Sequence, residues 1–224
     1  MHRLTEQEKA GVYKAISQRR DIRSFLPDPI PPEILDKLLL AAHQAPSVGL
    51  MQPWNFIIIQ DPAVKVSLAH AVEKEKRALA IHYEGTGREL TFLEMKIAGI
   101  LEAPVTLCVT CDPTRGGDHV LGRNSIPETD SMSVSCAIQN MWLAAYAEGV
   151  AMGWVSFYKK ADVRTLLQIP YHIDPMALIS LGYTDDYPDK PILELKDWEK
   201  RRSLQQLVFD NQWGQQQQIS PKKS

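Results

Sequence analysis

Residues 45–54 read APSVGLMQPW, and they follow the segment RRDIR at residues 19–23. The longer segment has prolines near both ends and small residues between them, so we expect a loop whose backbone amides can approach a planar ligand closely. The shorter segment places three guanidinium groups within five residues. A guanidinium group offers a planar fork of donors that suits phosphate. Together the two segments predict a phosphorylated aromatic cofactor.

The composition bounds the class of protein. With 224 residues, 44% hydrophobic and 23% charged, the chain suits one compact domain, or one domain with an inserted lid. Its net charge of −2 and its lack of a basic tract argue against a general nucleic-acid surface. The longest apolar runs, such as Phe56–Ile59, are too short to cross a bilayer, and residues 1–20 contain no secretory apolar region. We therefore expect a cytoplasmic protein without nucleic-acid or membrane partners.

The three cysteines fit a reducing compartment. Cys108 and Cys111 have the C-x2-C spacing of zinc and redox sites. However, they lie in a β-rich run at 105–111, where an offset of three residues directs side chains to opposite faces. No second pair of Cys or His residues completes a metal site. We expect buried thiols and no bound metal.

Capping residues and hydrophobic periodicity predict the regular elements. Thr5 and Glu8 form a capping-box pattern, Pro32 suits a first helical turn, and Gly149 suits the residue after a helix. The order αα-β-αα-β-α-β-α-β fits an α+β fold in which helices flank a sheet. The predicted strands lie at 54–60, 105–111, 151–157 and 176–183. The predicted helices are one that starts after Thr5, one from Pro32 to before Pro46, one that starts at Pro62, one that runs through Leu93, Ile97 and Ile100, one from Asp130 or Ser131 to Glu148, and a short one at 161–168.

We expect residues 1–214 to form a single domain with a helical lid inserted at about 73–103. The charge run at 73–77 also fits a solvated helix face, so the lid is one of two interpretations of this segment. The loop at 112–129 contains RGG at 115–117, which favours a mobile connection over an RNA-binding tract. Residues 215–224 are polar and predict a disordered tail.

The candidate site residues each have an ordinary structural alternative. Arg19, Arg20 and Arg23 lie between a helix end and a proline-rich turn, where the backbone is held, but they also fit a solvated basic turn. Asp21 lies among them and could simply pair with Arg23. Gln52 comes at the mouth of a buried strand, where ligands bind, although a Pro-Ser loop can merely end a helix.

Two later segments are further candidates. Gly153 permits close backbone approach, and the hydroxyl of Ser156 can donate to a polar ring edge; the alternative is a helix end followed by a core strand. Arg201, in WEKRR at 198–202, could add a remote phosphate contact, but such a segment is more often a polar helix start.

Taken together, these segments resemble the FMN-dependent nitroreductase superfamily. That superfamily has an early RRSxRxF segment, an APS…QPW loop and a later EGxxxGW segment, which match RRDIRSF at 19–25, APSVGLMQPW at 45–54 and EGVAMGW at 148–154. Asp21 departs from the usual Ser. With that departure and the motifs CVTCD at 108–112, TRGG at 114–117 and GWVS at 153–156, the chain is similar to the BluB branch, the 5,6-dimethylbenzimidazole synthases, over about residues 12–213.

The resemblance implies a central, mostly antiparallel sheet flanked by helices, with an inserted helical lid. It also implies a homodimer with two FMN sites at the subunit interface, in which the loop at 46–52 reaches the flavin of the partner subunit. In this branch reduced FMN is the substrate, and O2 fragments it to 5,6-dimethylbenzimidazole and erythrose 4-phosphate. The branch assigns catalysis to the residues matching Asp21 and Ser156. The implied cofactor-binding residues are Arg19, Arg20, Asp21, Ile22, Arg23, Pro46, Ser47, Gly49, Met51, Gln52, Arg88, Lys96, Gly153, Trp154, Ser156 and Arg201.

Two other functions are compatible with a flavin site. One is an ordinary nitroreductase or dehalogenase-like enzyme that turns over with NAD(P)H and an organic acceptor, and Asp21 at the Ser position argues against it. The other is a non-catalytic flavin-binding protein, which would keep the phosphate-binding arginines but would not need both Asp21 and Ser156.

Overall fold

The computed structural model describes residues 3–216 and divides the chain into two compact units, one up to Tyr187 and one from Pro188. The second unit contains the short helix α7 (Ile192–Leu195), a 3-10 turn at Leu204–Leu207 and an isolated bridge between Phe209 and Gln216. The predicted tail at 215–224 lies outside the described residues, apart from its first two. All further elements belong to the first unit, which holds the sheet.

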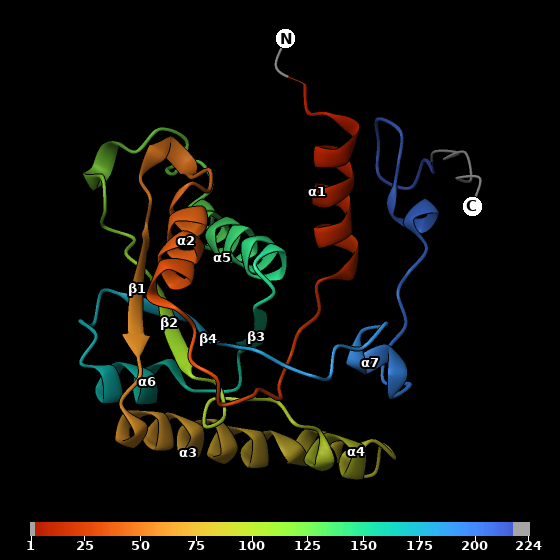
Figure 1. Cartoon of the computed structure of the whole chain (residues 1–224). Helices are drawn as coiled ribbons and strands as arrows, with labels where there is room; N and C mark the ends of the chain where they lie inside the picture. The colour runs from red at the N-terminus through yellow and green to blue at the C-terminus, as the bar shows by residue number, and fades with distance from the viewer. Residues whose placement is uncertain (1–2, 217–224) are drawn as a thin grey trace. The chain divides into compact units, whose positions relative to one another are not determined.

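The sheet contains four strands in the order β1-β2-β4-β3, and every neighbouring pair is antiparallel (Figure 1). The two central strands, β2 and β4, are buried along most of their length. The antiparallel α+β fold is confirmed. The strands are β1 (Trp54–Ile59), β2 (Val105–Cys111), β3 (Ala151–Val155) and β4 (Asp174–Gly182).

Helices cover both faces of this sheet (Figure 1). On one face, α2 (Pro32–His43) and α5 (Thr129–Ala147) pack together over alternate residues of the strands. On the other face lie α3 (Pro62–Leu79) and α6 (Lys160–Leu167), with the apolar residues of the segment that precedes β2. Because both faces are covered, the central strands are apolar almost throughout.

The capping residues act as the sequence predicts. The side chains of Thr5 and Glu8 form both bonds of the capping box at the start of α1 (Glu6–Gln18), and Asp61 caps α3. Gly149 has a φ of +73° immediately after α5, a conformation that glycine adopts without steric cost. Helix α1 is little buried: Tyr13 and Ile16, apolar residues three apart, are exposed, and Ala15 alone is buried within the helix.

The predicted helix through Leu93, Ile97 and Ile100 is wrong. Helix α4 (Glu89–Glu94) ends earlier, and turns and loops connect it to β2. The ammonium group of Lys76, on α3, donates to the carbonyl oxygens of Leu93 and Met95 at 2.6 and 2.8 Å. A side chain therefore satisfies carbonyls at the end of α4 that a longer helix would have used itself.

No helix among residues 3–216 is long and apolar enough to cross a membrane. The lid that we expect at about 73–103 corresponds to the last turns of α3, a 3-10 turn at Ala80–Tyr83, α4 and the connection to β2. Its role as a lid stays a prediction.

We expect Leu38→Ala to lower the free energy of unfolding by about 2–5 kcal/mol, because Leu38 is fully buried between α2 and the sheet and its truncation leaves a cavity. Denaturant unfolding monitored by circular dichroism measures the effect. Leu40→Ala on the same helix is the matched control. Leu40 is 56% exposed, so its change should stay within about 0.5 kcal/mol. Equal losses in the two variants would contradict the packing described here.

Candidate flavin site

The arginine segment at 19–25 lies along the edge of the sheet, against the edge strand β3. Asp21 and Met152 form a parallel bridge, in which the amide of Ile22 donates to the carbonyl oxygen of Met152 at 3.0 Å. Gly153 makes this approach possible. A Cβ at Gly153 would lie 2.0 Å from the carbonyl oxygen of Ile22, closer than any side chain can come. The structure thus places the chain's own backbone against Gly153, and the predicted role of Gly153 in cofactor binding stays a prediction.

Asp21, Arg23 and Trp154 form one hydrogen-bonded group. The guanidinium of Arg23 binds both carboxylate oxygens of Asp21 at 2.5 Å and donates to the carbonyl oxygen of Trp154 at 2.6 Å. The amide of Trp154 donates to Oδ1 of Asp21 at 2.9 Å. Both backbone polar groups of Trp154 thus bind this acid–base pair, which fixes the carboxylate on the edge strand.

Burial acts on both charges of this pair. It raises the pKa of Asp21 and lowers the pKa of Arg23, because each charged form loses solvation. The opposite charge of the partner counteracts both shifts, and the amide of Trp154 counteracts that of Asp21. The side chain of Asp21 nevertheless keeps 41% of its surface exposed, against 18% for Arg23. Asp21 is therefore a held carboxylate that a ligand can still reach.

The two preceding arginines are ordered by α5 and by the end of α1. The guanidinium carbon of Arg19 lies 4.8 Å from the ring centroid of Trp142, and the indole of Trp142 donates to the carbonyl oxygen of Arg20 at 3.2 Å. Nη1 of Arg20 donates to the carbonyl oxygens of Ser17 and Arg19. Nε of Arg19 is buried and has no hydrogen-bond partner among the described residues.

The loop at 46–52 has a backbone that favours glycine at several positions. Gly49, Leu50 and Gln52 have φ values of +50°, +55° and +49°. For residues with a side chain this conformation costs roughly 1–2 kcal/mol each, so neighbouring groups must hold it. Ser47 Oγ accepts from the amide of Gln52 at 3.0 Å, and Ser133 Oγ, on α5, accepts from the amide of Val48 at 3.1 Å.

The connection after β2, the loop at 112–129, packs directly on the loop at 46–52. A Cβ at Gly49 would lie 2.6 Å from Val120 and 2.9 Å from the amide nitrogen of Leu121. Arg115 donates to the carbonyl oxygens of Gln52 and Trp54. Sequence reasoning assigned this connection to a mobile loop and missed Arg115. An arginine immediately before two glycines with positive φ gives no periodic signal, and only the register of β1 against β2 brings it to Gln52.

The remaining predicted residues lie in different environments. Ser156 follows β3 directly, is exposed, and is two residues from Trp154. Lys96 donates to Ser24 Oγ at 3.3 Å and pairs with Glu102 at 2.5 Å, so it borders the arginine segment. Arg88 is the N-cap residue of α4. Arg201 belongs to the second unit, and its binding role stays a prediction.

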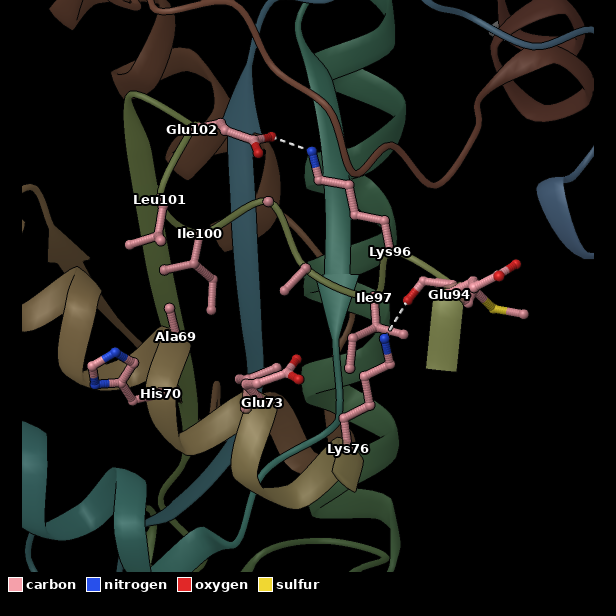
Figure 2. A pocket seen from close by; sticks show the side chains of 14 residues that line it. Ala69, His70, Glu73, Lys76, Glu94, Lys96, Ile97, Ile100, Leu101 and Glu102 are labelled. Atoms are coloured by element: carbon pink, nitrogen blue, oxygen red, sulfur yellow. Dashed lines mark hydrogen bonds and ion pairs between the residues drawn. The ribbon is translucent and has the colours of Figure 1, made fainter. Parts of the chain in front are cut away.

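A cavity of about 410 Å³ opens between α3 and the segment at 94–102 (Figure 2). Lys76 and Lys96 both line it, and Figure 2 shows the ion pair between Lys96 and Glu102 at its upper rim. The same segment contacts the arginine segment, because a Cβ at Gly99 would lie 2.6 Å from the carbonyl oxygen of Arg23. The cavity itself is lined by residues of α3 and of the 94–102 segment, and Asp21 is not among them.

The cysteines behave as the sequence predicts. Cys108 and Cys111 are buried and belong to the cores on opposite faces of the sheet. Burial raises the pKa of each thiol to about 12. Within residues 3–216 the structure contains no group of three or more His, Cys, Asp or Glu side chains that could hold a metal ion.

We expect Gly153→Ala to weaken flavin binding strongly, because its Cβ must displace the Ile22 carbonyl and the guanidinium of Arg23, which it would meet at 2.6 Å. Titration of FMN with the variant, followed by quenching of flavin fluorescence, measures the loss. Gly11→Ala is the control, since a Cβ there meets nothing within 4 Å, and in a helix it should stabilise the protein by about 0.5–1 kcal/mol. Undiminished FMN affinity in the Gly153 variant would show that the segment at 21–23 tolerates displacement.

Comparison with known proteins places this site in a family. The model of the nitroreductase family matches residues 16–183. A 5,6-dimethylbenzimidazole synthase from Rhodospirillum rubrum is 37% identical over 86% of this chain and 90% of the relative, and one from Rhodobacter capsulatus is 34% identical over 87% and 94%. An iodotyrosine deiodinase from Haliscomenobacter hydrossis is 35% identical over 85% of this chain and 86% of the relative.

Solved structures support the same fold. A BluB-like flavoprotein from Clostridium difficile has a TM-score of 0.69 at 17% identity and covers 90% of this chain and 99% of that structure. An oxidised iodotyrosine deiodinase bound to FMN and 3-iodo-L-tyrosine has a TM-score of 0.68 at 24% identity, over 80% and 94%. At these identities the likeness concerns the fold. From the family match and the identity to the curated relatives, the chain belongs to the nitroreductase family and, within it, to the 5,6-dimethylbenzimidazole synthases.

Proposed function

We propose that this protein fragments reduced FMN with dioxygen to 5,6-dimethylbenzimidazole, the lower ligand of cobalamin, and D-erythrose 4-phosphate. The observation that carries the proposal is its identity to curated synthases over nearly their whole length. The site adds a specific feature, because an aspartate held on the edge strand by Arg23 and Trp154 takes the place where the wider superfamily has Ser.

The residues of the arginine segment fit a ribityl phosphate. Arg19 keeps a buried Nε without a partner among the described residues, while its guanidinium lies over Trp142 and is thereby oriented. A phosphate monoester carries roughly −1.5 to −2 charges near neutral pH. Arg19 and Arg20 would hold that end of the flavin, and Arg201 is a further candidate. Arg23 binds Asp21 and Trp154, so we assign it first to orienting the carboxylate.

Reduced FMN, when bound, would supply two things: the electrons that reduce dioxygen, and the carbon atoms that become the rings of the benzimidazole. The protein has to move protons during this reaction, and Asp21 is the residue best placed to do so. Its carboxylate is fixed by three hydrogen bonds yet partly exposed, and burial raises its pKa above the usual value of an aspartate. Ser156, at the end of β3, would offer its hydroxyl to the polar ring edge.

We also propose that two copies of the chain form a homodimer, in which the loop at 46–52 of one subunit covers the flavin of the other. Exposed apolar side chains support this proposal. Leu50, in that loop, is 77% exposed, and Val12, Tyr13 and Ile16 are exposed on α1. The three side chains on α1 are spaced so that they lie on one face of the helix, and contiguous exposed apolar groups are typical of interaction surfaces. Light scattering after size exclusion tests the dimer: a monomer that makes the product at full rate would contradict it.

The test of the function is product analysis. The purified protein is incubated in air with chemically reduced FMN, and the products are separated by chromatography. We expect 5,6-dimethylbenzimidazole to accumulate as FMN disappears. Reoxidation of FMN without a benzimidazole would instead indicate a nitroreductase with an organic acceptor. Tight retention of FMN without turnover would indicate a flavin-binding protein, and either result would refute the proposal.

We expect Asp21→Asn to bind FMN with nearly unchanged affinity but to form product at least about 100-fold more slowly, because general acid–base groups typically contribute about 10²–10⁴ in rate. The amide keeps an oxygen that accepts from Trp154 but cannot exchange a proton. Asp162→Asn, which removes only a surface pair with Lys74 at 3.7 Å, is the matched control. Product formation at the parent rate in the Asp21 variant would remove Asp21 from the catalytic groups.

A further inference from the structure

Arg115 makes an unusual set of contacts for a loop arginine. Its Nη1 donates to the carbonyl oxygens of Gln52 and Trp54 at 2.6 and 2.9 Å, and its Nη2 donates to Oδ1 of Asn55 at 2.5 Å. Asp112 lies 3.8 Å from the same guanidinium. Three acceptors within four consecutive residues are thus bound by one planar group, which is the geometry that a guanidinium supplies and an ammonium does not.

The residues that Arg115 binds, within 52–55, lie where the loop at 46–52 leads into β1. Gln52 has a φ of +49°, and both of its backbone polar groups are bound by side chains: Ser47 accepts from its amide, and Arg115 donates to its carbonyl oxygen. A return of Gln52 to ordinary backbone angles would rotate these peptide groups away from their partners. The two side chains therefore keep Gln52 in its left-handed conformation.

The same connection holds the loop at a second point. Val120 and the backbone of Leu121 lie where Gly49 would carry a Cβ, and Gly49 also has a positive φ. The connection after β2 thus supports the loop at two residues with positive φ, by packing at Gly49 and by hydrogen bonding at Gln52. Of these two supports, Arg115 is the one that a single substitution can remove without filling or emptying the core.

We propose that Arg115 is a positioning residue that holds the loop at 46–52 in the conformation that binds flavin. The inference rests on the proposed function, in which this loop contacts the flavin ring. Arg115 acts through Gln52, because both of its terminal nitrogens are already bound to acceptors of residues 52–55. Its loss should therefore weaken FMN binding and misplace the ring, whereas Asp21 and Arg23 stay in place.

The experiment compares Arg115→Met, Arg115→Lys and Arg115→Ala in the full-length protein. FMN affinity is measured by fluorescence quenching, the placement of the ring by the visible circular dichroism of bound flavin, and turnover by kcat and KM for reduced FMN. We expect Arg115→Met to bind FMN at least tenfold more weakly with an altered flavin dichroism. Arg115→Lys should lie between it and the parent, because an ammonium reaches fewer of the three acceptors. Added guanidinium ion, at concentrations well below those that unfold the protein, should restore part of the affinity of Arg115→Ala.

Arg164→Met is the matched control. Arg164 also donates to a backbone carbonyl oxygen, that of Ile173, and pairs with Asp174, but at the entry to β4. Its loss should change the melting temperature and leave the flavin dichroism unchanged. If Arg115→Met keeps the parent affinity, dichroism and turnover, the proposal is wrong. If Arg115→Met does not fold, Arg115→Lys decides, because parent-like affinity in that variant would show that the three-acceptor geometry is not needed.

The two proposals fail in different ways. A parent protein that makes no 5,6-dimethylbenzimidazole refutes the proposed function, yet loss of FMN affinity in the Arg115 variants would still support the positioning role. Conversely, a parent that makes the product, together with variants that bind FMN normally, refutes the positioning role alone.

Discussion

The site depends on the hydrogen-bonded group that joins Asp21 and Arg23 to the backbone of Trp154. The carboxylate of Asp21 and the guanidinium of Arg23 compensate each other, because burial disfavours both charged forms. Their attachment to the backbone of Trp154 requires the segment at 21–23 to lie directly on β3, and this requires the missing side chain of Gly153. One glycine on an edge strand thus determines where the acid of the site lies.

Helix α5 connects this group with the loop at 46–52, the other part of the site. Near its start, Ser133 accepts from the amide of Val48 in the left-handed loop, and further along Trp142 donates to the carbonyl oxygen of Arg20. The helix places Val134, Ile138 and Met141 in the main core, so it cannot rotate without disturbing the sheet. Both halves of the site are therefore ordered by the same rigid element, although they are far apart in the sequence.

Much of the fold was predictable from local chemistry. The caps at Thr5 and Asp61, the proline at Pro32 and the glycine at Gly149 mark real helix ends, and the apolar runs at 54–60 and 105–111 are real strands. The end of α4 was not predictable, because it depends on an ammonium group from α3. The pairing of Asp21 with Arg23 was anticipated as the simple structural alternative, but its attachment to Trp154 and the contacts of Arg115 depend on strand register, which no short-range pattern records.

The two buried thiols of β2 determine how the core responds to oxidants. Burial raises the pKa of Cys108 and Cys111 to about 12, so the protonated thiol predominates at neutral pH. Oxidants such as hydrogen peroxide react with the thiolate form. The sulfur atoms of these two residues are therefore protected from sulfenic acid formation by their protonation state as well as by their burial.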